Sequence, residues 1–166
     1  MTKINSKAKG SSYERLIANL FSDKLAPLNF HRSMSSGAFL GGMNKHRTSK
    51  FSTDKAELLT GDIYSSDHNI RFNIECKNYK ESIPFHHFFT ETCIVKKWFA
   101  ESKYDADAIG KEPMLIFKFN RTPTFVAMLK KECSWTNNVM FINDLAVMTS
   151  ETFFENVTHE FFLESK

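Results

Sequence analysis

The chain has 166 residues, a length that fits one domain, and 42% of these residues are hydrophobic, which is enough for a core. No apolar run could span a bilayer, and the first seven residues lack the apolar segment of a signal peptide, so we expect a cytoplasmic protein without membrane contact. The three cysteines, Cys76, Cys93 and Cys133, show no Cys-x-x-Cys spacing. This excludes a zinc site or disulfide framework of the usual spacing and predicts reduced thiols.

The net charge of +3 is unevenly distributed along the chain. Residues 1–55 contain ten Lys and Arg against three acids, whereas residues 56–166 contain twelve against sixteen, so +7 is followed by −4. A basic half of this kind favours binding of a polyanion, although a solvated basic tail is the simpler alternative. We expect residues 1–10 to form a flexible basic arm and residues 11–166 to form a single domain.

A first helix is predicted to begin at Ser11 and to end before Pro27. Its apolar residues recur at helical spacing. They are Tyr13, Leu16, Ile17, Leu20 and Phe21. Ser11 and Glu14 have the spacing of a capping box, which would give the Glu14 carboxylate a purely structural role at the helix start. A role for Glu14 in a functional site is the alternative.

A strand is predicted near residues 29–34, followed by a segment to Thr60 with no clear periodicity. Such a segment is too long for a routine connection, so it indicates a functional loop or local disorder. It includes Lys45, Arg47 and Lys50, which suit contact with a phosphate backbone. An ordinary solvated loop is the competing interpretation.

The stretch from Gly61 to Lys77 carries the most chemistry. Residues 61–64 predict a short strand, and residues 65–69 a turn into a second strand, in which apolar and polar residues alternate strictly from Ile70 to Lys77. The hairpin can bring Asp62 beside Glu75, while Glu75 and Lys77 project from the same face. Two carboxylates and an ammonium suit Mg²⁺ and an anionic substrate, although an exposed Glu–Lys pair often serves only solubility.

The remaining elements alternate between helix and strand. A helix is predicted from Ser82 to near Ser102, with solvent-exposed His86 and His87. It would cross over to a central strand at residues 114–117, followed by strands at 124–128 and 139–142. A last helix is predicted to begin at Ser150.

Asp62 followed by Glu75-Cys76-Lys77 at the end of an apolar strand resembles the PD-(D/E)xK nuclease signature, with Gly61 where that family usually has proline. The upstream order is similar to that of cellular Holliday-junction resolvases. It comprises a helix with Glu14, then Arg32-Ser33, then Ser36-Gly37. The resemblance implies an α/β restriction-endonuclease-like core, in which a central mixed β-sheet is flanked by helices.

This resemblance implies a Mg²⁺-dependent, structure-selective DNA endonuclease of recombination or repair, most similar to a Holliday-junction resolvase. Asp62, Glu75 and the Cys76 carbonyl would hold the metal, for which Mn²⁺ should substitute, and Lys77 and Glu14 would complete the catalytic set. The expected contacts to branched DNA are Lys9, Arg32, Ser33, Ser36, Lys45, Arg47 and Lys50.

The high phenylalanine content, seventeen residues, suggests that some lie at the interface of a homodimer, which would also suit symmetric cutting. The alternatives are another nuclease of this superfamily, with a nicking, repair or restriction-like role, and a catalytically silent nucleic-acid-binding protein of the same fold.

Overall fold

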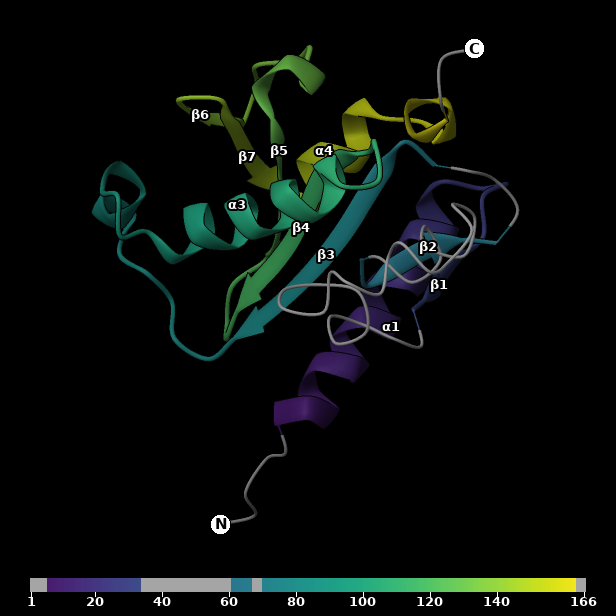
Figure 1. Cartoon of the computed structure of the whole chain (residues 1–166), viewed down its shortest axis with the longest axis horizontal. Coiled ribbons are helices and arrows are strands. Elements are labelled where there is room, and N and C mark those ends of the chain that lie inside the picture. The colour runs from purple at the N-terminus through teal and green to yellow at the C-terminus, as the bar shows by residue number, and fades with distance from the viewer. Residues whose placement is uncertain (1–5, 34–60, 67–69, 164–166) are drawn as a thin grey trace.

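The computed structural model describes the chain except for residues 1–5, 34–60, 67–69 and 164–166. The described residues form a seven-stranded sheet in the order β1-β2-β3-β4-β5-β7-β6 (Figure 1). The strands are β1 (Phe30–Arg32), β2 (Ile63–Ser65), β3 (Phe72–Tyr79), β4 (Glu112–Phe119), β5 (Thr124–Leu129), β6 (Met140–Ile142) and β7 (Leu145–Thr149). The α-helices are α1 (Ser6–Lys24), α3 (Ile94–Asp107) and α4 (Ser150–Asn156). Three short 3₁₀ helices are η2 (Phe85–Phe89), η3 (Lys130–Glu132) and η4 (His159–Phe162).

The sheet is mixed, because β3 and β4 run parallel while the other neighbouring strands are antiparallel. A parallel pair needs a crossover connection, and α3 supplies it. Helices α1 and α4 pack on one face of the sheet and α3 on the other (Figure 1). The predicted α/β fold with a central mixed sheet flanked by helices is therefore confirmed.

Strand β3 shows how the alternating pattern divides between these two layers. Phe72, Ile74 and Cys76 are buried in the core beneath α1. Glu75 and Lys77 lie on the other face, since their register partners in β4 belong to the core beneath α3. The predicted separation of the apolar and charged residues is correct, and it leaves the charged pair in the middle of a well-packed strand.

Helix α1 begins earlier than predicted. It starts at Ser6, so residues 6–10 are helical rather than part of a flexible arm, and Ser11 lies inside the helix. Because Ser11 is not the N-terminal cap, the capping-box interpretation of Glu14 is wrong. The apolar stripe buries Tyr13 and Ile17 as expected, but Leu16 is 57% exposed.

The predicted helix from Ser82 to Ser102 is in fact two elements. The 3₁₀ helix η2 ends at Phe89, and α3 begins only at Ile94. The hydroxyl of Thr90 donates to the carbonyl of His87 at 2.8 Å, a local bond that competes with continuation of the helix. As a result the side chain of Phe85 is exposed rather than part of a continuous buried face. The predicted exposure is correct for His86, while His87 is half-buried.

Many of the phenylalanines lie in one core beneath α1. Phe21 contacts Phe30 edge to face at 5.4 Å between ring centroids, and it contacts Phe162 in the same manner at 5.7 Å. Phe153 of α4 stacks on Phe21 as well. The phenylalanine content is thus explained largely within one chain, so it does not support a dimer.

Among the described helices, none has both the length and the apolar character needed to cross a membrane.

Candidate active site

The site lies where β2 separates from the edge of β3. These strands pair in register only through Ile63 and Ile74, and just before this pair the backbone N–H of Asp62 donates to the carbonyl of Ile74 at 2.8 Å. The Asp62 Oδ2 atom accepts a hydrogen bond from the backbone N–H of Cys76, also at 2.8 Å. Asp62 is therefore held to β3 by both its backbone and its side chain, as the predicted hairpin requires.

Gly61 explains why this chain lacks proline before the aspartate. Its φ is +80°, whereas a proline ring fixes φ near −65°. A Cβ atom at this position would also lie 2.5 Å from Oδ1 of Asn73 and 3.0 Å from the carbonyl oxygen of Ile74. The chain therefore enters β2 through a backbone conformation that favours glycine, at a point where there is no room for a side chain.

Glu75 and Lys77 form an ion pair on β3, with 2.6 Å between Nζ of Lys77 and Oε1 of Glu75. Residues two apart on a strand share a face, which brings these two side chains together. The Glu75 side chain is 16% exposed and that of Lys77 is 31% exposed. The pair is therefore largely withdrawn from water but open at one side, which differs from a fully solvated surface pair.

Helix α1 and strand β1 add a second ion pair at the same place, between Glu14 and Nε of Arg32. The next residue, Ser33, donates its backbone N–H to the carbonyl of Asp62 at 2.8 Å. The negative charge of Glu14 acts on both Asp62 and Glu75. Three carboxyl groups from three different elements thus converge, and Arg32 and Lys77 each neutralise one of them.

Crowding of these acids changes their protonation. Burial raises the pKa of the Asp62 carboxyl to about 8, with further increases from the charges of Glu75 and Glu14, against the lowering effect of the Cys76 N–H. Burial likewise raises the pKa of Glu75, although Lys77 opposes this effect. Full ionisation of these carboxyl groups is therefore unfavourable in the folded protein. A bound cation would favour their ionised forms.

Two neighbours of the acids keep single protonation states. Burial and the nearby charge of Asp62 raise the pKa of the Cys76 thiol, so it remains protonated and is not a nucleophile. Burial alone would lower the pKa of Lys77, but the carboxylates of Glu75 and Asp62 outweigh it, so this pKa is raised. Lys77 is therefore an ammonium group at neutral pH.

Helix α3 contributes charges that the sequence analysis did not identify. Asp105 raises the pKa of Glu75, and Glu101 acts in the same direction on Lys77. These two acids are spaced i, i+4 and so lie on one side of the helix. The spacing was visible in the sequence, but the split between η2 and α3 hid which face would meet β3.

Oxygen ligands of the type that Mg²⁺ prefers are available here. Asp62 uses Oδ2 for the Cys76 N–H, and Glu75 uses Oε1 for Lys77, so the second oxygen of each carboxylate can serve as a ligand. Within the described residues, no three His, Cys, Asp or Glu side chains group closely enough to hold a metal by themselves. The donor set therefore fits a cation that keeps several waters, as Mg²⁺ usually does.

The predicted DNA contacts have different outcomes. Lys9 is on the surface of α1 and donates to Oδ1 of Asn120 at 2.9 Å. Arg32 is engaged with Glu14, and Ser33 is only 1% exposed, so its side chain is not presented to DNA in this structure. The remaining predicted contacts, Ser36, Lys45, Arg47 and Lys50, lie outside the described residues.

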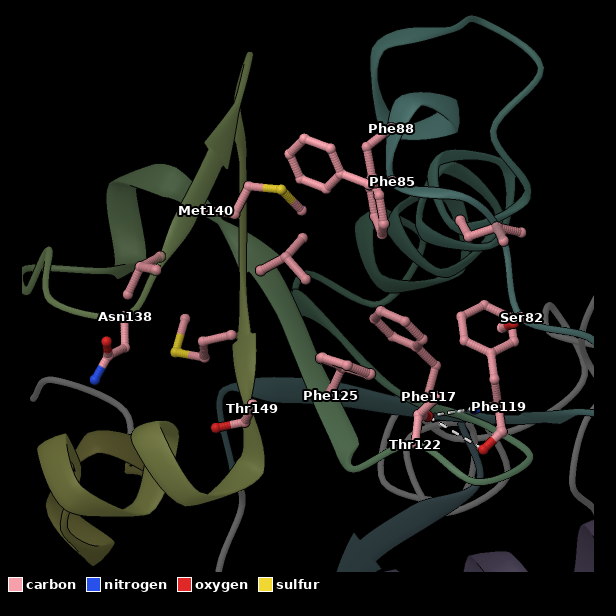
Figure 2. Close-up of a pocket in the computed structure, with 14 residues that line it drawn as sticks. Ser82, Phe85, Phe88, Phe117, Phe119, Thr122, Phe125, Asn138, Met140 and Thr149 are labelled. Carbon is pink, nitrogen blue, oxygen red and sulfur yellow. Dashed lines mark hydrogen bonds between the residues drawn. The ribbon is translucent and has the colours of Figure 1, made fainter.

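A separate cavity of about 550 Å³ lies between η2 and strands β4 to β7 (Figure 2). Phe88, Phe117 and Met140 are among its apolar lining residues, and Ser82 and Asn138 are among the polar ones. None of its lining residues is charged. The cavity contains none of the predicted site residues and offers no acid–base chemistry, so the reactive groups remain Asp62, Glu75 and Lys77.

The fold, with Asp62 directly before β2 and Glu75-Cys76-Lys77 in β3, defines a restriction-endonuclease-like protein. The model of the family described as phage putative PDDEXK endonucleases matches residues 5–163. The chain therefore belongs to this family, and its class of activity is that of a nuclease.

Among solved structures, the chain is similar to the Holliday junction resolvase Hjc of Archaeoglobus fulgidus, an archaeal hyperthermophile. The match covers 87% of each chain at 11% sequence identity, with a TM-score of 0.40. The comparison with curated proteins found no match.

Proposed function

We propose that the protein is a Mg²⁺-dependent endonuclease that hydrolyses phosphodiester bonds in DNA. The observation that carries the proposal is the convergence of Asp62, Glu75 and Lys77 at the point where β2 leaves β3. Asp62 is fixed by the Cys76 N–H at 2.8 Å, and Glu75 lies 2.6 Å from the Lys77 ammonium. A buried pair of acids with an adjacent cation lowers the stability of the fold, and such groups are typical of functional sites. Metal-assisted attack on a phosphate is a reaction that needs these groups.

The proposed metal ligands are the second carboxylate oxygens of Asp62 and Glu75 together with the carbonyl of Cys76. When bound, Mg²⁺ would lower the pKa of a water molecule and withdraw charge from the phosphate. Its two positive charges would also offset the burial and the neighbouring carboxylates that raise the pKa of Asp62 to about 8. Mn²⁺ prefers similar ligands and should substitute.

Lys77 is proposed to orient the attacking water or to stabilise charge that develops on the phosphate. Its raised pKa keeps it charged, and its partial exposure leaves it accessible to a substrate. Lys77 pairs with Glu75 in this structure. In the complex, Glu75 would contact the metal while Lys77 would contact the water or the phosphate.

Glu14 is proposed to act next to the metal, and Arg32 to position it. The ion pair between them is half-buried, so the guanidinium neutralises a carboxylate that would otherwise repel both Asp62 and a DNA phosphate. Contact between Arg32 and DNA would then need this ion pair to be shared or exchanged.

Selectivity for branched DNA and action as a homodimer are the finer parts of the proposal. They rest on the resolvase-like order of Glu14, Arg32-Ser33 and the Asp and Glu-x-Lys strands, and on the symmetry of a four-way junction, which suits two equivalent sites. Contacts from Lys45, Arg47 and Lys50 remain part of this proposal, as does the cytoplasmic location.

The test compares cleavage of labelled four-way junctions, forks, gapped duplexes and plain duplexes by the wild type, Asp62→Asn and Glu75→Gln. Both variants keep the side-chain shape, so they should retain DNA binding but lose cleavage with Mg²⁺ and with Mn²⁺. Glu151→Gln removes an exposed acid on α4 and is the control that should cut normally. Cleavage by either site variant at the wild-type rate would refute the assignment.

Selectivity for four-way junctions is tested separately from cleavage. A resolvase should bind the junction in the presence of excess duplex of the same sequence, and mixed dimers of wild-type and Glu75→Gln subunits should nick one strand without completing resolution. Equal cutting of linear duplex and junction, or a monomer on DNA in sedimentation, would leave a general nuclease instead.

A further inference from the structure

A groove of about 440 Å³ lies between α1 and the carboxyl ends of the central strands. It is lined by Lys9, Ser12, Tyr13, Leu16, Asn78, Lys118, Asn120 and Arg121. On α1, the exposed lining residues Ser12 and Leu16 project from the opposite flank of the helix to Glu14, given 100° of rotation per residue. The groove is therefore distinct from the acid cluster, although the same helix borders both.

The lining is suited to a polyanion. Three of its residues, Lys9, Lys118 and Arg121, are cations, and none is an acid. Lys9 is held over the groove by its hydrogen bond to Asn120. Lys118 and Arg121 have no ion pair with any other residue in the described part of the chain, so their charge is available to a ligand.

The backbone of Arg121 supports a role for its side chain. Its φ is +63°, in the left-handed region that costs most residues about 1 kcal/mol. At the two other described non-glycine positions with positive φ, the residue is asparagine, namely Asn138 and Asn143, and asparagine tolerates this region better. An arginine in the same conformation gives up stability, which is a pattern typical of functional positions.

The groove lies within reach of a strand that passes through the acid cluster. Asn78 directly follows Lys77 in β3, and Lys118 is its register partner in β4. Because side chains alternate along a strand, Asn78 and Lys118 point to the face of the sheet on which α1 packs, whereas Glu75 and Lys77 point to the α3 face. The groove and the Glu75–Lys77 pair therefore lie on the two faces of the sheet, near the carboxyl end of β3.

From these observations we infer that the groove binds the phosphodiester backbone of the DNA strand beyond the carboxyl ends of β3 and β4, on the α1 side of the sheet. The inference rests on the proposed function. Lys118 and Arg121 would contact phosphates, and the exposed side chain of Leu16 would lie against the sugars. Such contacts carry no base specificity and fix the register of the strand relative to Glu75 and Lys77.

The experiment measures DNA binding at several salt concentrations without Mg²⁺, so that no cleavage interferes. The variant combines Lys118→Gln with Arg121→Asn, and the matched control combines Lys24→Gln with Lys97→Gln, which removes two exposed charges elsewhere. Loss of two phosphate contacts should reduce the slope of log K against log salt by about 1.8 and weaken binding roughly 60-fold at 0.1 M salt.

Folding and function are separated by two further readouts. Arg121→Asn alone should not lower the melting temperature, because asparagine relieves the backbone cost, so weaker binding by this variant reflects the lost side chain. If the groove variant has the same slope of log K against log salt as the wild type and the control, the proposed role of the groove in DNA binding is refuted. If no DNA is cut by the wild type but the slope still falls in the groove variant, the groove stands and the proposed nuclease function fails.

Discussion

Replacement of Asp62 by asparagine should stabilise the protein in the absence of metal. The buried carboxyl has a pKa of about 8, against 3.8 in an unfolded chain. The folded state therefore binds more protons than the unfolded state between these values, so wild-type stability falls as pH rises from about 4 to about 8. Asparagine has no charge to bury, and its Oδ1 atom can still accept the hydrogen bond from the Cys76 N–H.

The magnitude follows from the same values. Each pH unit corresponds to about 1.4 kcal/mol, so at pH 7 the interval above 3.8 gives roughly 4 kcal/mol. Because Glu75 and Glu14 share the repulsion and adjust with Asp62, we expect about half of this, or about 2 kcal/mol. For a chain of this length, that change raises the melting temperature by about 4 to 8 °C.

The assay is thermal unfolding of both proteins at pH 5, 6, 7 and 8 in EDTA, and again with Ca²⁺, which binds without supporting cleavage in this test. In EDTA the advantage of Asp62→Asn should grow steadily with pH. Ca²⁺ should raise the melting temperature of the wild type more than that of the variant and so narrow or reverse the gap. If the difference in melting temperature between the two proteins in EDTA is independent of pH, the argument that the pKa of Asp62 is raised in the folded state is refuted.

Three other experiments test features of the fold. Gly61→Ala should lower stability by about 2 to 4 kcal/mol in denaturant unfolding, because the positive φ and the lack of space both oppose a side chain. Phe162→Ala should cost about 3 to 5 kcal/mol, whereas Phe89→Ala, at 65% exposure, should change stability by less than about 0.5 kcal/mol. Arg32→Gln and Glu14→Gln should show a coupling energy of about 1 to 2 kcal/mol in a double-mutant cycle, and a value near zero would mean that their ion pair is not formed in solution.

The hairpin with Asp62, Glu75 and Lys77 could be predicted from the sequence because its signals are local. Strict alternation fixes which face of a strand each side chain occupies, and the polar turn fixes the pairing of the two strands. The pairing of Glu14 with Arg32 could not be predicted in this way. It joins a helix to a strand, and the local capping pattern at Ser11 offered a competing explanation for the same glutamate.

Errors elsewhere in the fold have similar causes. The spacing of aromatic residues suggested one helix from Ser82 to Ser102, but the hydrogen bond from Thr90 to His87 ends the first turn before α3 begins. Strand β7 was missed because its first four residues are continuously apolar, a pattern that does not distinguish a buried strand from a helix. Counting phenylalanines also could not show that most described ones pack within the chain.

The contacts among these phenylalanines set the order in which the site can form during synthesis. Phe21 of α1 and Phe30 of β1 pack against Phe153 and Phe162, which are made more than a hundred residues later. Until those late residues leave the ribosome, the helix that carries Glu14 and the strand that carries Arg32 lack part of the aromatic core against which they pack. A nascent chain therefore presents its acids to the surrounding nucleic acid without the geometry that would make them a nuclease.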